Sequence, residues 1–147
     1  MGQRLIIVLM GASGSGKSTW VRNNLTKAHH VYCLDAIRMN NEMDIGSFAT
    51  AKRLQAIKAA EQGWPLIADA THLIKAHRDI WRNLGNRLGI ETKLIVFDTQ
   101  LTTMLQVQKT RAYPVANKVV VNGYRQLQSS LKTIQLEGWG EVELIKR

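Results

Sequence analysis

The chain has 147 residues, of which 20 are Lys or Arg and 11 are Asp or Glu, so its formal net charge is +9 with histidine neutral. That length fits one domain with one core, expected over residues 1–147. With 45% hydrophobic and 21% charged residues, the composition excludes a disordered or collagen-like chain, and the single cysteine, Cys33, excludes an internal disulfide and a cysteine-cluster zinc site. The positive charge indicates an anionic partner, and the cysteine usage indicates a reducing cytoplasm.

The sequence predicts neither export nor membrane insertion. The apolar run at residues 5–10 is too short for a signal peptide and passes directly into a segment rich in glycine and serine. No stretch approaches the roughly 20 apolar residues of a membrane-spanning helix. We therefore expect a protein without membrane contact that acts in the cytoplasm.

Short apolar runs alternate with longer helical patterns along the chain. The expected strands, in chain order, are Leu5–Met10, His30–Leu34, Leu66–Ala68 running into Asp69, Thr92–Phe97 and Val142–Ile145. The expected helices are Lys17–Thr26, Ser47–Gln62, Ile74–Leu88, Leu101–Val107 and Val115–Leu131. This alternation predicts a three-layer α/β/α fold, with a parallel sheet of about four or five strands covered by helices on both faces.

Residues 11–18 have the spacing of a phosphate-binding loop: a glycine, four residues, then Gly-Lys-Ser. Its glycines let successive backbone N–H groups curl around a phosphate at the positive end of the following helix. A flexible loop that merely ends in lysine would lack the strand before it and the helix after it. The pattern therefore predicts a P-loop NTPase fold with ATP and Mg²⁺ as ligands. The residues expected to bind ATP are Gly11, Ser13, Gly14, Ser15, Gly16, Lys17, Ser18 and Thr19.

Within this loop two side chains have specific tasks. Lys17 would reach the β- and γ-phosphates, and the Ser18 hydroxyl would ligate Mg²⁺. The acceptor of the phosphoryl group should then lie at the carboxyl ends of the neighbouring strands, where ligands of open α/β sheets bind.

The second strand ends at Asp35, and Arg38 follows about one helical turn later. A carboxylate there can take the proton of an acceptor hydroxyl, and the guanidinium can hold an anionic group of the acceptor through two hydrogen bonds. Alternatively, Asp35 caps the next helix and Arg38 is a solvated surface cation. The position after a strand of this fold favours the functional interpretation.

The third strand ends in Asp69-Ala70-Thr71-His72. An aspartate there commonly faces the metal ion or orients active-site groups, although capping or turn formation is an alternative. His72 and His77 lie five residues apart, a spacing that does not place them on one helix face as a metal pair. We expect both histidines at the polar surface or in a substrate groove.

The segment 99–136 has no Asp or Glu and carries the cations Lys109, Arg111, Lys118, Arg125 and Lys132. Kinases with a phosphate-binding loop close an arginine-bearing lid over the transferring phosphoryl group. Arg111 lies between two helical patterns and is the predicted lid arginine, in a lid at about residues 108–118. The last three cations are individually expected on a solvated helix face.

Together these motifs resemble the kinase domain of phage and bacterial polynucleotide 5′-hydroxyl kinases. The resemblance rests on residues 11–20, 35–38, 66–72 and 111–115. In that family the position of Asp35 is the general base for the 5′-hydroxyl, and that of Arg38 contacts the 3′-phosphate of the acceptor. The positions of Lys17 and Arg111 bind the donor phosphates, and Asp69 matches an active-site carboxylate, with Thr71 beside it at the substrate.

The resemblance implies transfer of the γ-phosphate of ATP to 5′-hydroxyl ends of DNA or RNA, in the cytoplasm or, for a phage-encoded enzyme, the host cytoplasm. Relatives form homo-oligomers and are often fused to a phosphatase. The chain has no second Asp-x-Asp signature, so a stand-alone kinase domain is expected. Two alternatives are a small-molecule kinase of the gluconate, shikimate, adenylylsulfate or zeta-toxin type, and a non-enzymatic nucleic-acid-binding module switched by ATP.

Overall fold

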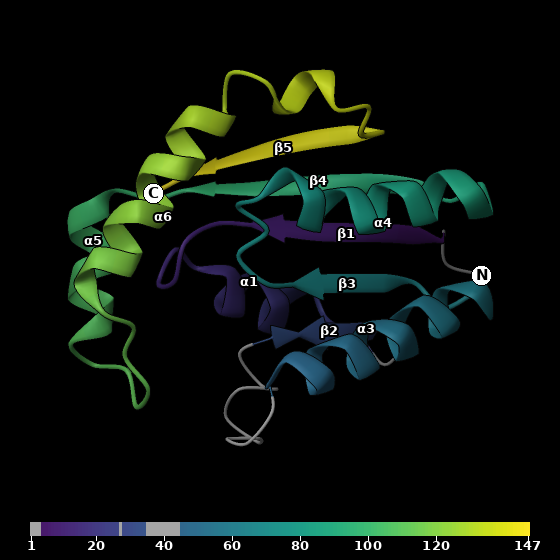
Figure 1. The fold of residues 1–147 in the computed structure, drawn as a ribbon, viewed down its shortest axis with the longest axis horizontal. Helices are drawn as coiled ribbons and strands as arrows, with labels where there is room; N and C mark the ends of the chain where they lie inside the picture. The colour runs from purple at the N-terminus through teal and green to yellow at the C-terminus, as the bar shows by residue number, and fades with distance from the viewer. Residues whose placement is uncertain (1–3, 27, 35–44) are drawn as a thin grey trace.

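The computed structural model describes residues 4–26, 28–34 and 45–147. Five strands form one sheet in the order β2-β3-β1-β4-β5, and every neighbouring pair is parallel (Figure 1). The strands are β1 (Leu5–Met10), β2 (His30–Cys33), β3 (Leu66–Asp69), β4 (Glu91–Asp98) and β5 (Glu141–Lys146). All five predicted strands are confirmed, including the last one.

The helices agree with the predicted pattern except at their ends. They are α1 (Lys17–Asn24), α3 (Ile45–Glu61), α4 (Lys75–Leu88), α5 (Leu101–Gln108) and α6 (Asn117–Ser130), with a 3₁₀ turn at Ile134–Leu136. Helix α6 begins two residues later than predicted, because Ala116 is extended at its N-terminal cap and the N–H of Val115 is bonded to a side chain instead. Helix α4 ends at Leu88 and is capped by Gly89, whose φ of 67° is a left-handed conformation that suits glycine.

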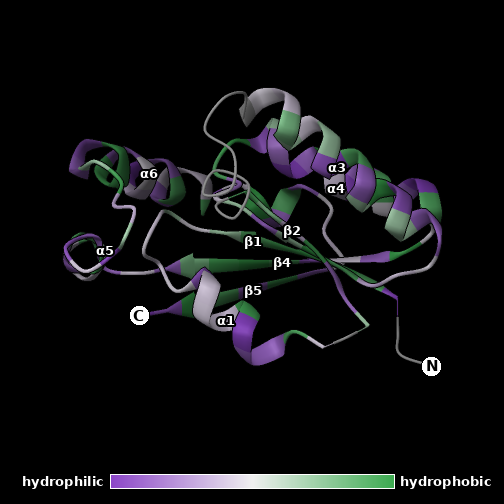
Figure 2. Cartoon of the chain, turned by 90° about the horizontal axis from the view of Figure 1, so that it is seen from below, coloured by the Kyte–Doolittle hydropathy of each residue, from purple (hydrophilic) through white to green (hydrophobic). Residues whose placement is uncertain are grey.

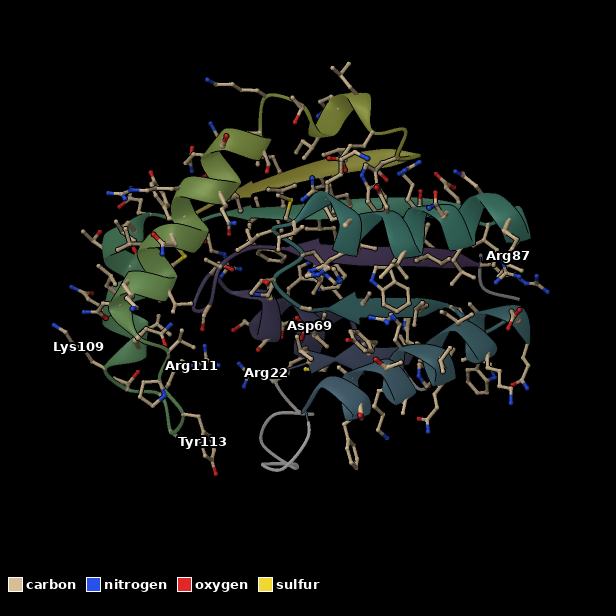
Figure 3. The ribbon with its side chains drawn as sticks, viewed as in Figure 1. Arg22, Asp69, Arg87, Lys109, Arg111 and Tyr113 are labelled. Carbon is tan, nitrogen blue, oxygen red and sulfur yellow. The ribbon has the colours of Figure 1, made fainter. Side chains whose placement is uncertain are left out.

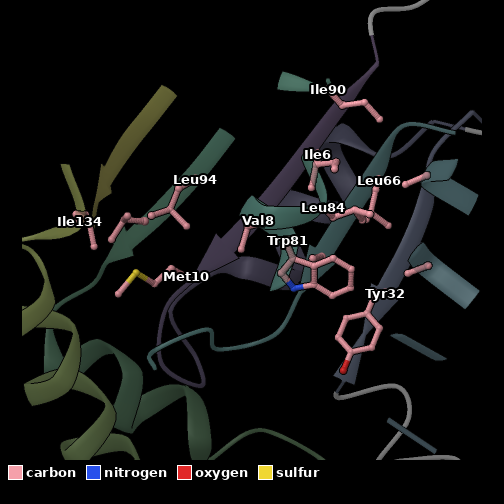
Figure 4. Close-up of a cluster of buried hydrophobic side chains, with 14 of the residues drawn as sticks. Ile6, Val8, Met10, Tyr32, Leu66, Trp81, Leu84, Ile90, Leu94 and Ile134 are labelled. Atoms are coloured by element: carbon pink, nitrogen blue, oxygen red, sulfur yellow. The ribbon is translucent and has the colours of Figure 1, made fainter. Parts of the chain in front are cut away.

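The two faces of the sheet are covered by different helices (Figure 2). Ile7 and Leu9 of β1 point to the face that α1 covers with Trp20 and Val21. The even-numbered residues of β1 point to the opposite face, where α3 and α4 lie and where Trp81 is 1% exposed. Figure 4 shows Trp81 beside Tyr32, with the two ring centroids 5.3 Å apart. The predicted α/β/α layers are confirmed.

This topology places the end of β1 at the centre of the sheet, between β3 and β4. Helices α5 and α6 stand beyond the carboxyl ends of the strands, where the segment after β1 emerges (Figure 1). Helix α6 approaches that segment closely at Gly123, since a Cβ there would lie 3.1 Å from the Cβ of Ala12. In the described part of the chain, no helix has the length and apolar character needed to cross a bilayer.

Candidate functional site

The loop after β1 has the backbone that its glycines predict. Gly14 has φ 87° and Gly16 has φ 108°, conformations that residues with a Cβ rarely adopt. Helix α1 begins immediately afterwards, and no side chain caps its first turn. Its free N–H groups and its dipole therefore make the loop an anion-binding site.

Lys17 is buried inside this loop. Its Nζ donates hydrogen bonds to the carbonyl oxygens of Gly11 at 2.8 Å and Ala12 at 3.2 Å. The side chain is only 6% exposed, so its ammonium group is held within the concave side of the loop rather than in solvent. A cation in this position can be transferred from carbonyl oxygens to phosphate oxygens by a small change of rotamer.

The loop is fastened from outside by Thr99 and Gln108. The Thr99 hydroxyl donates to the carbonyl oxygen of Ser15 at 2.7 Å. The amide of Gln108 donates from Nε2 to the Ser13 carbonyl at 3.1 Å, and its Oε1 accepts the N–H of Val115 at 2.9 Å. Residues of the β4–α5 loop and of α5 thus hold the carbonyl groups of Ser13 and Ser15.

The segment between α5 and α6 brings Arg111 to the loop. Its Nη1 donates to the Ser13 hydroxyl. Figure 3 shows Arg111 extending toward the ends of the strands, whereas Lys109 extends away from them. Of the cations in the acid-free segment, Arg111 is therefore the one that the fold directs to the phosphate-binding loop.

A cavity of about 300 Å³ lies against the N–H side of the loop. Its lining residues are Gly14, Ser15, Gly16, Lys17, Ser18, Thr19, Thr99, Thr103, Val107, Arg111 and Arg147. Arg147 was not predicted: its Nη1 lies 2.9 Å from the position that a Cβ of Gly16 would take. The backbone of Arg147 is held by two hydrogen bonds. Its N–H donates to the carbonyl of Asp98, and its carbonyl accepts from the N–H of Gln100.

The three residues that sequence reasoning missed, Thr99, Gln108 and Arg147, have no motif of their own. Each lies just after a strand or at the end of a helix, far from residues 11–18 in the sequence. Only the alternation of strands and helices, which places all loops after parallel strands at one edge, could have suggested them.

A second cavity of about 290 Å³ has Ala12 and Ser13, at the start of the loop, in its lining. Its other walls come from the β3–α4 connection, α4, the segment before α6 and α6 itself: Thr71, Leu73, Ile74, His77, Val115, Val119, Asn122, Gly123 and Gln126. This lining combines aliphatic side chains with amides, in contrast to the cationic first cavity. The phosphate-binding loop therefore contributes to two cavities of different chemistry.

Asp69 ends β3 beside the loop, in register with Leu9 of β1 and Cys33 of β2. It is 7% exposed, and the Cys33 thiol donates to its Oδ2 at 3.6 Å. The carbonyl of Thr71 accepts the N–H of Gly11 at 2.9 Å, which ties the end of this segment to the start of the loop. Asp35 and Arg38 lie outside the described residues.

The expectation that His72 lies at the surface or in a groove is wrong. The side chain is 4% exposed, its Nδ1–H donates to the Leu9 carbonyl at 2.7 Å, and its Nε2 accepts the indole N–H of Trp81 at 3.0 Å. Burial lowers its pKa to about 4, so the imidazole is neutral at pH 7. His77, by contrast, lines the second cavity. Among the described residues, no three His, Cys, Asp or Glu side chains gather as a metal site.

The residues of the first cavity fit a nucleoside triphosphate with its metal ion. The loop supplies backbone N–H groups, Lys17 and Arg111 supply positive charge, and no Asp or Glu stands among the described residues that line the cavity. The hydroxyl of Ser15 is buried without a hydrogen-bond partner in the described structure. Ser18 adds the kind of oxygen ligand that Mg²⁺ prefers.

Similar folds occur in several solved structures. A chain of the Pnkp1/Rnl/Hen1 RNA repair complex superposes with a TM-score of 0.75 at 18% identity, covering 91% of this chain and 47% of that one, so the chain spans about half of this relative. A chain of the PezAT toxin–antitoxin system of Streptococcus pneumoniae gives 0.70 at 17% identity, covering 99% and 68%. Deoxyadenosine kinase from M. mycoides with bound dATP gives 0.58 at 14%, covering 95% and 90%.

At these identities the likeness shows the fold, which is that of P-loop kinases. No curated protein matches the sequence significantly. The model of the AAA domain family matches residues 6–133, a range that includes the phosphate-binding loop, the lining of both cavities except Arg147, and the segment that carries Arg111. The chain therefore belongs to the AAA domain family, with a P-loop kinase-like fold.

Proposed function

We propose that the protein is an ATP-dependent polynucleotide 5′-hydroxyl kinase, which transfers the γ-phosphoryl group of ATP to the 5′-hydroxyl end of DNA or RNA. The observation that carries the proposal is the pair of cavities that both use the phosphate-binding loop as a wall, one cationic and one lined by aliphatic and amide groups. A transferase needs a donor and an acceptor that meet at one phosphoryl group, and this arrangement supplies a place for each.

The first cavity takes the donor. Backbone N–H groups of residues 13–19 hold the phosphates, and Lys17 exchanges its carbonyl partners for β- and γ-oxygens. Ser18 would hold Mg²⁺, which when bound neutralises part of the phosphate charge. Arg111 leaves the neutral Ser13 hydroxyl for the γ-phosphoryl oxygens, whose charge it stabilises as the transferring bond breaks.

The second cavity takes the acceptor nucleoside. Val115 and Val119 offer aliphatic contact to a base, while Asn122 and Gln126 offer amide groups that both donate and accept hydrogen bonds. Thr71 lies in the same lining, together with Ala12 and Ser13 of the phosphate-binding loop. This mixture suits a nucleoside better than a small polyhydroxylated or purely anionic metabolite.

The acceptor hydroxyl needs a base, and the resemblance gives that role to Asp35, two residues after β2 in the sequence. Asp69, which ends the adjacent strand β3, lies at the carboxyl edge of the sheet, where ligands of this fold class bind. Arg38 would hold the 3′-phosphate of the acceptor. We place the lid at about residues 108–118, in a kinase domain that acts in the cytoplasm and forms a homo-oligomer.

The test is transfer of labelled γ-phosphate from ATP with Mg²⁺ to single-stranded DNA and RNA that end in a 5′-hydroxyl. Matched strands with a 5′-phosphate, together with a panel of sugars, shikimate, adenylylsulfate, UDP-linked sugars and deoxyadenosine, serve as alternative acceptors. We expect label only on the 5′-hydroxyl strands, and none with the Lys17→Ala variant.

The variant Asp35→Asn separates chemistry from donor binding. It should bind ATP as the wild type does and lose about 10²- to 10⁴-fold in transfer rate, because a carboxamide cannot accept the hydroxyl proton. Label on a small metabolite but not on the strands would replace this proposal with a small-molecule kinase. ATP-dependent strand binding without any transfer would replace it with a switched binding module.

A further inference from the structure

Three cations of the acid-free segment recur at intervals of seven residues: Lys118 and Arg125 on α6, and Lys132 in the turn that follows it. Seven residues are nearly two helical turns, so Lys118 and Arg125 lie on one face of the helix, about 10 Å apart along its axis. All three side chains are exposed. We call these three residues the α6 cationic stripe.

The stripe belongs to the solvent-facing side of α6. The opposite side of the helix is fixed by burial, since Val120, Gly123 and Leu127 are its buried residues. Each residue of an α-helix is rotated by about 100° from the one before it. Positions 118 and 125 are therefore more than about 100° away from all three buried positions around the helix axis. Packing against the core therefore does not use these cations, and their charge is available to a ligand.

The positive charge of the stripe is not balanced locally. The sequence has no Asp or Glu between residues 99 and 136. In the described part of the chain, Lys75, Arg82, Arg87 and Lys93 all form ion pairs with carboxylates, whereas no ion pair involves a member of the stripe. The spacing of about 10 Å exceeds the Debye length of about 8 Å in physiological salt, so neighbouring members repel one another little and each can attract its own anionic group.

The stripe runs beside the second cavity. Val119, Asn122 and Gln126 line that cavity, and each is a sequence neighbour or lies one turn from Lys118 or Arg125. On the helix, Asn122 lies between the cavity wall and the stripe. A ligand that fills the cavity and extends out of it over α6, at the carboxyl end of the sheet (Figures 1 and 2), meets the stripe next.

We propose that the α6 cationic stripe binds the phosphodiester backbone of the acceptor strand beyond its first nucleotide. The inference rests on the proposed function and adds to it that the acceptor is a polynucleotide several residues long. A stacked strand advances about 3.4 Å per nucleotide, so the interval between two cations corresponds to about three nucleotides. A regular row of unpaired cations complements a regular row of phosphates and has no counterpart in a small metabolite.

The experiment measures kcat/KM for a nucleoside 3′-phosphate and for 5′-hydroxyl single strands of about three to twelve nucleotides, a range that exceeds the reach of the stripe. For the wild type we expect kcat/KM to rise with strand length and then level off. In the Lys118→Ala/Arg125→Ala variant, the ratio of kcat/KM for the longest strand to that for the nucleoside 3′-phosphate should fall about tenfold.

The matched control is Lys58→Ala/Arg87→Ala, which removes the same charge from helices remote from α6. Its ratio should equal that of the wild type. Binding of a fluorescent strand, followed by anisotropy against salt concentration, gives a readout without catalysis. The slope of log K against log salt should decrease by about 1.4 in the stripe variant, for two lost single-strand contacts, and stay constant in the control.

Each result has one meaning. Equal ratios in the stripe and control variants, or a wild-type kcat/KM that does not depend on length, would overturn the inference and leave the proposed kinase activity standing. Absence of transfer to every strand and to the nucleoside 3′-phosphate would instead overturn the proposed function. Equally tight binding to anionic phospholipid vesicles would show that the stripe recognises membranes, which also overturns the inference.

Discussion

Ser13 is the residue at which the phosphate-binding loop meets the segment between α5 and α6. Its hydroxyl accepts from Arg111 and, at 3.2 Å, from Gln108. A guanidinium bonds more strongly to a phosphate than to a neutral hydroxyl, so the Arg111 contact is one that a bound triphosphate can replace. The pair thus holds the arginine near the donor before the donor arrives.

Arg111→Ala should reduce kcat about 10²- to 10³-fold, which is the usual effect of removing one donor that stabilises transition-state charge. The free energy of unfolding should change little, because the residue is only half-buried at the loop. Steady-state kinetics and urea unfolding measure the two quantities.

The matched control is Lys109→Ala, which removes a positive charge two residues away on a side chain that extends away from the site (Figure 3). It should retain nearly the wild-type kcat. A comparable loss in both variants would show that general positive charge, and not the position of Arg111, supports the reaction.

His72 is a structural histidine with a defined tautomer. Because Trp81 donates to Nε2, the proton must lie on Nδ1, which donates to Leu9 of the central strand. The side chain therefore joins α4 to β1 just beside the loop. Protonation would put a hydrogen on Nε2 facing the indole N–H, so the folded state resists it.

His72 makes stability depend on pH. Its pKa is about 4 in the folded chain against 6.5 for a free histidine, so between these values the unfolded chain binds a proton that the folded chain does not. The free energy of unfolding should fall as pH falls through this window, by about 3 kcal/mol in total, and be constant above it. Urea unfolding between pH 4 and 7.5 measures this contribution.

The variant His72→Gln should lose this part of the pH dependence. His77→Gln, which removes an exposed histidine of α4, should keep the wild-type profile. Identical profiles for all three proteins would show that groups other than His72 determine acid stability.

At the scale of elements, Gln108 closes the segment that carries Arg111. Its amide joins the last residue of α5 to Ser13 on one side and to Val115 on the other. Both ends of the segment 108–115 are therefore attached at one buried side chain, which is 4% exposed. This attachment fixes both ends of the segment that carries Arg111.

Gln108→Glu replaces the amide donor by a carboxylate that repels the Ser13 carbonyl. We expect faster hydrogen exchange in residues 109–116 and a destabilisation of about 1–3 kcal/mol, the cost of an unsatisfied buried polar contact. Hydrogen exchange followed by mass spectrometry and urea unfolding measure these effects.

Gln106→Glu is the matched control, since it makes the same change on the exposed side of α5. Exchange in residues 109–116 should then equal that of the wild type. If Gln108→Glu leaves exchange unchanged as well, the segment is held by other contacts.

At the scale of the whole molecule, a buried ion pair ties the C-terminal region to the middle of the chain. Arg78 of α4 makes two parallel hydrogen bonds to Glu137 and a third, at 3.0 Å, to the carbonyl of His72. The side chains are 2% and 3% exposed. The pair fixes the segment between α6 and β5, and β5 leads to Arg147, which lines the first cavity.

Arg78→Met should destabilise the protein by about 3–5 kcal/mol, because it leaves a buried carboxylate without its partner. Arg78→Met/Glu137→Gln should recover part of that loss, since no charge is then buried alone. Urea unfolding of both variants measures the difference. A double variant whose free energy of unfolding is no higher than that of Arg78→Met would contradict this explanation.

Much of this molecule follows from local patterns. The strand Leu5–Met10 is predictable because six consecutive apolar residues precede a glycine. The loop after it is predictable because Gly14 and Gly16 stand where the phosphate-binding loop needs a positive φ, and Lys17 follows them. Helix ends were less predictable: the start of α6 depends on a side chain of α5, which no local pattern of residues 115–117 reveals.

The burial of His72 is a feature that local sequence patterns do not predict. The sequence places His72 after a strand and gives no sign that Trp81, nine residues later, turns its indole N–H toward it. Burial of a polar residue depends on whether a partner reaches it, and that partner is supplied by the packing of α4 against the sheet.

The sequence by itself determined the alternation of strands and helices, the phosphate-binding loop and the acid-free segment, because periodicity, glycine spacing and charge are local properties. The tertiary structure alone decided that Thr99, Gln108 and Arg147 meet at that loop, that two cavities share it as a wall, and that Lys118 and Arg125 run beside one of them. The reason is physical: parallel strands bring loops distant in sequence to one edge of the sheet, and only packing sets which side chains face each other there.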